Sequence, residues 1–467
     1  MKDAFAFDLN YAPKEILEHI ISFMTDKSQR VMRLASTKWF KLINYRNFSL
    51  YFTSAKQMPQ IVDRLLQYDS PIGIKFKKSN MQIAAMEHLS RLTNLTSLEV
   101  FPIDFRGPNY GEGIRMTALT NLQEWNVPHD CPTPILAALT NMKELHMVAS
   151  DSAAQLTDSI KRMSNLQCIA FLMPDYCPMD LYSLLPGPSR LTRLEIKSNM
   201  NHDNMTKLYN LKDLRYNDDQ SENGPNQIPL DKFTALHTLQ VENGSVSAMP
   251  TSLTNLSISG DVPLDSRTAN EVARLPGLKS LLLSGFENDD TLLSFVSQLT
   301  LLEEFVVWPL RGDQFTEHMT GAFFSNLTSS KLVTMTLSVT SHMRLDHLSL
   351  LTGLVDLFCY EELAGDEVVD YSFVSHLTRL TSFMIYVADT RPSLSAITNL
   401  ENLKQLTIDE ANVMSYELPN ISLRLLTGLE RLSLAHCSPS TVESFSALKN
   451  LTLLRAPVTY KTVNYEF

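Results

Sequence analysis

The sequence lacks several features that would assign it to other protein classes. No uninterrupted apolar run reaches the roughly 18 residues that a transmembrane helix requires, and the first ten residues hold two acids and no apolar run, unlike a secretory signal. Glycine is scarce, at 15 of 467 residues, which excludes collagen-like and glycine-linker architectures. The five cysteines are widely spaced without a Cys-x-x-Cys pair, and no histidine lies at zinc-ligand spacing from two cysteines. We therefore expect an intracellular protein of the cytoplasm or nucleus, with free thiols, no metal and no membrane contact.

Basic residues are also in deficit. The 40 Lys and Arg against 51 Asp and Glu give a formal net charge of −11. Binding to nucleic acid needs clustered cations that contact phosphates, and the main local cluster here is Lys75, Lys77 and Lys78. Such a short cluster is typical of a solvated surface. We expect no nucleic-acid partner.

Catalytic signatures are missing as well. The sequence has no Walker loop, no Gly-x-Ser-x-Gly, no His-Glu-x-x-His and no dinucleotide fingerprint. The glycines of 107–113 suggest a loop, but no phosphate-binding context follows them. His342 and His347 flank Asp346 inside an ordinary leucine-rich phrase, which favours plain surface or core positions. We expect a non-enzyme with no catalytic residues and no cofactor.

What the sequence does contain is a repeat. The phrase Leu-Thr-Asn-Leu-x-x-Leu-x-Val of 92–100 returns with substitutions along most of the chain. The third apolar anchor of each copy falls at Leu98, Trp125, Leu145, Ile169, Leu194, Leu214, Leu239, Leu256, Leu281, Phe305, Met335, Leu357, Phe383, Leu406, Leu432 and Leu454. These sixteen anchors have a mean spacing of about 23.7 residues, within the 20–29 typical of leucine-rich repeats.

The spacing has a direct physical meaning. Anchors two residues apart point to the same face of a strand, and upstream patterns such as Leu394, Ile397 and Leu400 indicate a short helix. One strand and one helix cannot bury an apolar edge alone, but stacked copies can. The sequence thus predicts an α/β leucine-rich-repeat solenoid with a curved parallel sheet inside and short helices or loops outside. The alternative is chance recurrence of leucine-rich phrases in another α/β protein. The asparagine that the family places three residues after the second strand anchor is largely missing; only Asn199 and Cys437 occupy that position suitably.

Residues 8–48 do not fit the repeat. Pro13 and Glu15 are typical of a first helical turn, and the apolar residues that follow, from Ile16 to Met24, form one stripe. A break near Asp26 and two further short apolar helices complete the segment. We predict a helical domain at 8–48, a helical connector or cap at 49–71 and the solenoid at 72–460.

The helical segment resembles an F-box. The matching residues are Ala12, Pro13, Glu15, Ile16 and Leu17, then Ile20, Ile21, Phe23 and Met24, then Leu34, Ala35, Ser36, Lys38 and Trp39. The sequence departs from the motif with Ala12 in place of its leading Leu, with Ala35 in place of Val, and with Gln29–Arg30 where apolar residues are common. An F-box followed by leucine-rich repeats is a recognised arrangement. The alternative is a helical cap on the N-terminal end of the solenoid.

This resemblance implies a function and a partner. An F-box binds a Skp-type adaptor and through it a cullin, so the chain would be the substrate-recognition subunit of an SCF-type ubiquitin ligase, with its repeats binding a protein substrate. The expected adaptor-contact residues are Pro13, Ile16, Leu17, Ile20, Ile21 and Trp39. The alternative is a leucine-rich-repeat interaction scaffold without ubiquitin coupling.

A substrate would bind the concave face of the sheet, which carries the strand residues that flank the inward anchors. Most residues there are small or polar, but one sector holds large side chains. This expected substrate-binding patch comprises Val306, Trp308, Phe358, Tyr360, Met384 and Tyr386. Two other interpretations remain open: a loop covers the sector, or the register is wrong by one residue and these side chains point inward. Acids outnumber bases at the concave positions, which modestly favours a basic substrate segment, although an ordinary solvated sheet face has the same composition.

Overall fold

The computed structural model divides the chain into two compact units, 1–211 and 212–467. It describes residues 62–63, 66, 72–76, 88–89, 91–100, 120–127, 138–147, 158–172, 190–197, 208–217, 228–243, 246–260, 266–286, 293–309, 320–329, 331–339, 343–361, 369–387, 395–410, 423–434, 445–458 and 461–466. The predicted helical domain at 8–48, with all six adaptor-contact residues, lies outside the described residues. So does most of the predicted connector at 49–71, together with Asn199 and Cys437.

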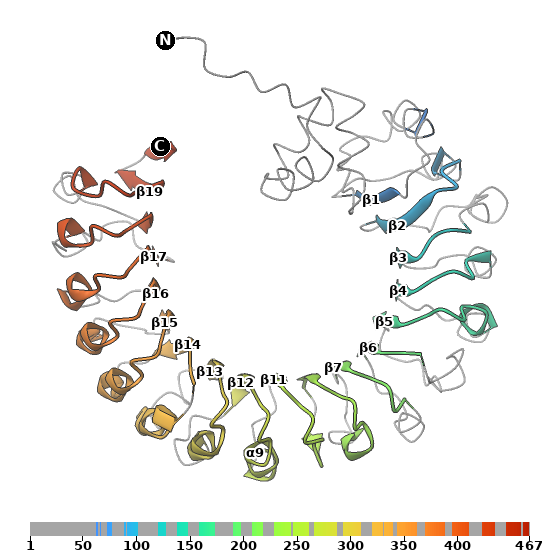
Figure 1. Ribbon diagram of the computed structural model, residues 1–467, viewed down its shortest axis with the longest axis horizontal. Helices are drawn as coiled ribbons and strands as arrows, with labels where there is room; N and C mark the ends of the chain where they lie inside the picture. Colours follow the sequence, from blue (N-terminus) through green and yellow to red (C-terminus); the bar gives the residue numbers. More distant parts are fainter. Residues whose placement is uncertain are drawn as a thin grey trace, which may run out of the picture. The chain divides into compact units, whose positions relative to one another are not determined.

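The first unit contains a parallel sheet in which each strand pairs with the next along the chain (Figure 1). Its strands are β1 (Ile72–Phe76), β2 (Leu95–Val100), β3 (Glu124–Val127), β4 (Glu144–Met147), β5 (Cys168–Leu172) and β6 (Arg193–Lys197). One strand per repeat, always paired with the previous repeat's strand, is the arrangement that the spacing of the anchors predicts.

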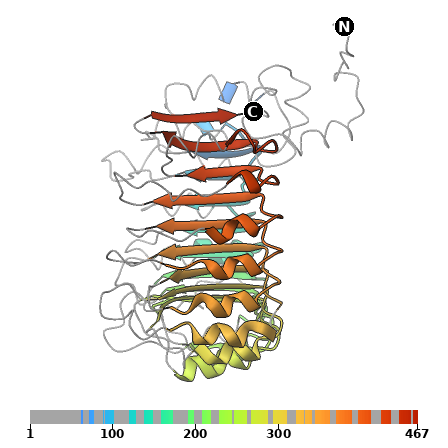
Figure 2. The same ribbon diagram turned by 90° about the vertical axis from the view of Figure 1, so that its left-hand side faces the viewer.

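The second unit repeats the same arrangement over a longer row of strands (Figure 2). In order of pairing they are β7 (Asp213–Asn217), β9 (Thr238–Glu242), β11 (Asn255–Ser259), β12 (Ser280–Phe286), β13 (Glu304–Pro309), β14 (Thr334–Val339), β15 (Asp356–Glu361), β16 (Ser382–Val387), β17 (Gln405–Glu410), β18 (Arg431–Leu434) and β19 (Leu453–Val458). All of these pairs are parallel. Strand β20 (Lys461–Glu466) is antiparallel to β19, and β8 (Ile228–Pro229) pairs with β10 (Val246–Ser247) in a separate small sheet. The sequence reading did not predict these last three strands.

Helical turns lie on the outer side of the second unit, opposite the face of the sheet that lines the inner side of the curve (Figure 1). Among the helical elements of this unit whose bounds the structure describes, one is an α-helix, α9 (Ser266–Ala273). The others are 3₁₀ turns: η5 (Leu230–Lys232), η6 (Ser294–Gln298), η7 (Ala322–Ser329), η8 (Leu345–Leu350), η9 (Ser372–His376), η10 (Ser395–Asn399) and η11 (Leu423–Leu425). The short helices expected outside the sheet are thus mostly 3₁₀ turns, and the repeat's three-residue anchor spacing matches the 3.0 residues per turn of this form.

The predicted strand register is confirmed. All sixteen third anchors are buried, with 5% exposure or less. In β15, for example, buried and half-buried residues alternate along the whole strand, so Leu357 and Cys359 face the core while Phe358 and Tyr360 face the other way. The apolar anchors of successive repeats therefore form one continuous core between the sheet and the helical turns of each unit.

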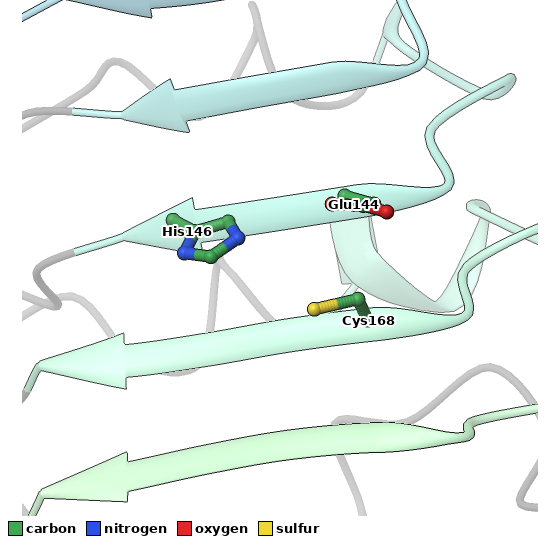
Figure 3. Close-up of side chains that lie close together, drawn as sticks. All are labelled: Glu144, His146 and Cys168. Carbon is green, nitrogen blue, oxygen red and sulfur yellow. The ribbon is translucent and has the colours of Figure 1, made fainter. Parts of the chain in front are cut away.

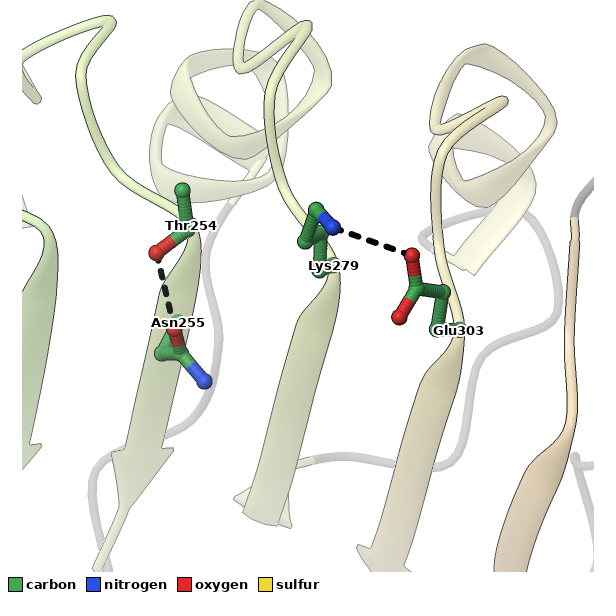
Figure 4. Close-up of polar contacts among 4 residues, drawn as sticks. All are labelled: Thr254, Asn255, Lys279 and Glu303. Carbon is green, nitrogen blue, oxygen red and sulfur yellow. Dashed lines mark hydrogen bonds and ion pairs between the residues drawn. The ribbon is translucent and has the colours of Figure 1, made fainter.

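Neighbouring repeats are also joined by main-chain bonds just before each strand. The carbonyl of Lys279 accepts hydrogen bonds from the amides of Glu303 and Glu304, at 2.8 and 2.9 Å. The carbonyl of Glu303 does the same for the next repeat, and the pattern continues to β19. An ion pair adds to these links between repeats: Lys279 Nζ lies 3.1 Å from Glu303 Oε1 (Figure 4). Within a single repeat, Thr254 Oγ1 donates to Asn255 Oδ1 at 2.8 Å.

The asparagine of the Leu-Thr-Asn-Leu phrase forms a second link between repeats. Its side-chain amide donates to the main-chain carbonyl of the Thr in the preceding copy. The described examples are Asn121 to Thr93, Asn141 to Thr120, Asn402 to Thr378 and Asn450 to Thr427, each at 2.8 or 2.9 Å. Parallel strands, one per repeat, with a buried leucine ladder and these inter-repeat links, make up a leucine-rich-repeat solenoid.

Candidate protein-binding surface

The six residues of the predicted patch lie on three strands of the second unit, and all of them are half-buried. Val306 and Trp308 come from β13, Phe358 and Tyr360 from β15, and Met384 and Tyr386 from β16. Because they alternate with fully buried anchors, they occupy the concave face and not the core. The register places Phe358 beside Met384 and Tyr360 beside Tyr386. We call these six residues the concave aromatic cluster.

The rings of the concave aromatic cluster contact one another in a continuous row. Trp308 lies with its ring centroid 5.5 Å from that of Tyr360 and 6.0 Å from that of Phe358. Tyr360 in turn stacks on Tyr386, with centroids 4.7 Å apart and an interplanar angle of 10°. Such offset and edge contacts are the favoured geometries of aromatic pairs. The row therefore presents one connected apolar surface.

A small residue makes this row possible. Strand β14 lies between β13 and β15, so the backbones that carry Trp308 and Tyr360 are about 9.6 Å apart, two strand spacings. Their rings meet because Ser338, in register with Tyr360 on β14, leaves room for both to extend over it. Ser338 is fully buried although it lies at a concave position, and its hydroxyl has no hydrogen-bond partner. The rings therefore cover the serine and bridge three strands.

The charges around the concave aromatic cluster have one sign. The fifteen concave positions of β13 to β17 hold three carboxylates, those of Glu304, Asp356 and Asp409, and no basic side chain. Asp409 lies in register with Tyr386, at one end of the aromatic row. The nearest concave cation further along the sheet is Arg431 on β18. A ligand on this face meets aromatic rings bordered by negative charge.

Beneath the sheet, next to the concave aromatic cluster, the structure holds a buried polar pair. Glu361 ends β15 at an inward position, is fully buried, and accepts a hydrogen bond of 2.7 Å from the hydroxyl of Tyr371. Burial raises the pKa of the Tyr371 phenol well above its ordinary value, and nearby Cys359 and Glu361 add to the effect. Burial also raises the pKa of the Cys359 thiol, with Glu361 adding to it. The sequence reading missed this pair, because the alternation places Glu361 inward but gives no indication of its partner.

The other residues considered in the sequence are the charged residues of the concave face and the cysteines. The concave acids and bases occupy the positions expected from the register, so Glu124, Glu304, Arg215 and Arg455 are exposed. Neither Cys168 nor Cys359 forms a disulfide, and both are buried. Among the residues that the structure describes, no helix has the length and apolar character needed to span a bilayer.

Comparison with known proteins yields no family model that matches and no curated protein that matches. Solved structures do match. A leucine-rich-repeat protein of Leptospira interrogans shares 16% identity over 70% of this chain and 87% of its own, with a TM-score of 0.40. An internalin of Listeria monocytogenes shares 17% identity over 85% of this chain and 89% of its own, with a TM-score of 0.30. TLR13, solved in complex with ssRNA13, shares 15% identity over 86% of this chain and 65% of its own, with a TM-score of 0.43. The solenoid assignment therefore depends on this chain's own strands and anchors, and the matches carry no information on its ligand.

Proposed function

We propose that this protein is a non-catalytic recognition subunit whose concave face binds an extended segment of another protein. The observation that carries the proposal is the concave aromatic cluster, which extends across four neighbouring strands, β13 to β16, and is half-buried. Trp and Tyr dominate the energetics of many protein interfaces, and a connected apolar patch that solvent can reach often marks an interaction site.

The surrounding charge narrows the chemistry of the ligand. Arg and Lys side chains bind over aromatic faces, with about 0.5–1 kcal/mol at exposed sites and about 2 kcal/mol when desolvated. Carboxylates at Glu304, Asp356 and Asp409 favour the same cations. We therefore infer that the bound segment carries Lys or Arg next to apolar side chains.

Trp308 makes this inference testable in the intact protein. Titration of the full-length chain with an oligo-arginine peptide containing Leu should change the fluorescence of Trp308, and a matched oligo-glutamate peptide should not. The Trp308→Ala, Tyr360→Ala double variant lacks this fluorophore, so its binding is measured by calorimetry. It should bind the basic peptide about tenfold more weakly, because two cation–π contacts of the size above are lost. Its melting temperature should change little, since both side chains are half-buried.

The control is a double variant at equivalent concave positions on β11, Ser257→Ala with Ser259→Ala, which should bind as wild type does. Equal binding of the acidic peptide, or an unchanged affinity in the Trp308/Tyr360 variant, would refute the inference. A large loss of thermal stability in that variant would show that the rings serve the core and not a ligand.

The finer proposal is that the recognition subunit belongs to an SCF-type ubiquitin ligase of the cytoplasm or nucleus. It is supported by the resemblance of residues 12–39 to an F-box and by the repeats that follow. In such a ligase the receptor performs no chemistry; it raises the local concentration of substrate lysines near the charged ubiquitin-conjugating enzyme. The alternative function is an interaction scaffold without ubiquitin coupling, which needs the same concave face.

Adaptor binding distinguishes the two functions. The full-length protein should co-purify with a Skp-type adaptor, and Ile16→Asp with Leu17→Asp should abolish the interaction because buried aliphatic contacts contribute on the order of 1.5–3 kcal/mol each. Lys14→Asp with Glu18→Asp places two aspartates at polar positions outside the apolar stripe and serves as the matched control. If wild type and the Ile16/Leu17 variant both fail to bind the adaptor, the scaffold function stands in place of the ligase.

A further inference from the structure

Two neighbouring strands of the first unit bring together three side chains that bind metals. Glu144 and His146 project from concave positions of β4, on either side of the buried anchor Leu145. Cys168 opens β5 and lies in register with Glu144. A carboxylate oxygen, a ring nitrogen and a sulfur atom from the three residues all lie within 4.8 Å of one another. Figure 3 shows the thiol of Cys168 pointing toward the ring of His146 across the gap between the strands.

The local packing holds these groups together. Cys168 is only 5% exposed, whereas Glu144 and His146 are half-buried, so the sulfur lies at the base of the group and the other two donors lie nearer to solvent. Ala170, in register with His146, has only a methyl group and does not displace the imidazole from β5. Exposed residues of opposite charge, Glu124 on β3 and Arg193 on β6, lie in register with the two ends of the group.

The donor set selects one class of ion. Calcium and magnesium prefer oxygen ligands, whereas sulfur, imidazole nitrogen and carboxylate oxygen are the donors of Zn²⁺. With bond lengths of about 2.3 Å to sulfur and about 2.0–2.2 Å to nitrogen and oxygen, tetrahedral ligands lie about 3.5 Å apart. The present separations, none of them above 4.8 Å, need to contract by at most about 1.3 Å, which rotation of the Glu144 and His146 side chains on the open face can supply. A thiolate, a carboxylate and a neutral imidazole also balance the charge of a divalent cation.

We propose that Glu144, His146 and Cys168 form a binding site for a divalent transition metal ion, with Zn²⁺ as the best-fitting ion. Three protein ligands leave one coordination position, which faces the solvent side of the sheet and accepts water or a donor from a bound molecule. The site lies in the first unit, on β4 and β5, and is independent of the function proposed for the second unit.

Cobalt is a suitable probe because its thiolate complexes absorb strongly and its tetrahedral complexes have characteristic visible bands. The full-length protein, freed of metal, should bind one equivalent of Co²⁺ with a thiolate charge-transfer band, and Zn²⁺ should displace it. Cys168→Ser should remove that band. His146→Gln and Glu144→Gln should each weaken Zn²⁺ binding at least tenfold.

Glu124→Gln is the matched control, because it removes a neighbouring carboxylate that is not part of the group; it should change the affinity by less than twofold. The melting temperatures of the metal-free variants verify that each is folded, and Zn²⁺ should raise the melting temperature of wild type and of Glu124→Gln only. A charge-transfer band that persists in Cys168→Ser, an equal effect of Glu124→Gln, or the absence of a saturable band in wild type would overturn the proposal.

Discussion

At the scale of single residues, the buried pair of Glu361 and Tyr371 has the strongest consequences for stability. A fully buried carboxyl group is costly unless hydrogen bonds compensate it, and the Tyr371 hydroxyl supplies one at 2.7 Å. Tyr371 directly precedes η9, so the bond ties the end of β15 to the start of the next helical turn. The pair therefore fixes the connection between two elements from inside the core.

We predict that Tyr371→Phe lowers the free energy of unfolding at pH 7 by about 1–3 kcal/mol, because it leaves the buried carboxyl group without this donor. The difference from wild type should shrink above pH 10. The unfolded chain releases the phenol proton near the ordinary value of 10.0, while the folded protein retains it because its pKa is raised. The contribution of Tyr371 to wild-type stability is thus complete below pH 10 and falls above it by about 1.4 kcal/mol per pH unit, a loss that the variant does not share.

Urea titrations at pH 7, 10 and 11 measure both effects. Tyr360→Phe is the control, because it changes a tyrosine on the concave face. The Cys359 thiol, whose pKa is also raised, adds a loss of stability above about pH 9 that is common to all three proteins. A Tyr371→Phe protein as stable as wild type at pH 7, or a constant difference at every pH, would contradict the prediction.

At the scale of elements, the Asn links explain why the Leu-Thr-Asn-Leu phrase recurs. Each Asn donates to a main-chain carbonyl at the turn that precedes the neighbouring strand, and so satisfies a backbone acceptor there. These bonds run along the stack near the start of the strands, on the opposite end from the position where the family's usual asparagine lies. The row of asparagines that is usual in leucine-rich repeats is largely missing here, and a row of asparagines at a different position in the repeat forms hydrogen bonds between neighbouring copies.

We predict that Asn402→Ala lowers the free energy of unfolding by about 0.5–1.5 kcal/mol, since one exposed inter-repeat hydrogen bond is lost. Asn399→Ala is the matched control, because Asn399 is an exposed asparagine at the end of η10. Surface substitutions usually change the free energy of unfolding by less than about 0.5 kcal/mol, and we expect no larger effect here. Chemical denaturation compares the two variants with wild type. Equal effects of the two substitutions would show that the link does not stabilise the stack.

The sequence predicts the strands, whose positions follow from the repeated apolar anchors. It does not predict the type of helical turn or the contacts between side chains of different repeats. Strand positions follow from a period-two alternation that a shift of one residue would reverse, and this is why all sixteen third anchors are found buried. The 3₁₀ form of the turns was not predicted, because an apolar spacing of three fits both a 3₁₀ turn and an α-helical turn. The candidate surface follows the same rule: alternation places Trp308 and Tyr360 on the concave face, but only the structure shows that Ser338 lets their rings meet.

The site of Glu144, His146 and Cys168 could not be found from the spacing of residues in the sequence. Metal motifs are recognised in sequences when the ligands lie a few residues apart, whereas Cys168 is separated from His146 by a whole repeat. A parallel sheet brings residues one repeat apart to about 4.8 Å. Once the strand register is known, cross-strand pairs of His, Cys, Asp and Glu can be read from the sequence.

At the scale of the whole molecule, the two units are rows of parallel strands, and such a row has exposed backbone groups at its edges. In the second unit, β20 pairs antiparallel with β19 along six register positions, from Leu453 opposite Glu466 to Val458 opposite Lys461. An uncovered edge strand of this length would be a template for pairing with another chain. Strand β20 therefore covers the edge of β19 and takes its place as the outer strand; it begins with Lys461 and ends with Glu466, and charged residues on an edge strand oppose pairing with another chain.

We predict that truncation after residue 459 makes the protein self-associate, because it exposes the edge of β19 that β20 covers. Light scattering coupled to gel filtration over a tenfold range of concentration should show a mass that rises with concentration for the truncated protein and not for wild type. Deletion of residue 467 alone shortens the chain but leaves β20 intact, and this control should behave as wild type does. If the truncated protein kept the same mass throughout, with its circular dichroism preserved, the role of β20 as an edge cover would be excluded. Where the truncated protein does associate, Arg455→Pro in the truncated chain should suppress the association, because proline disturbs strand pairing by β19.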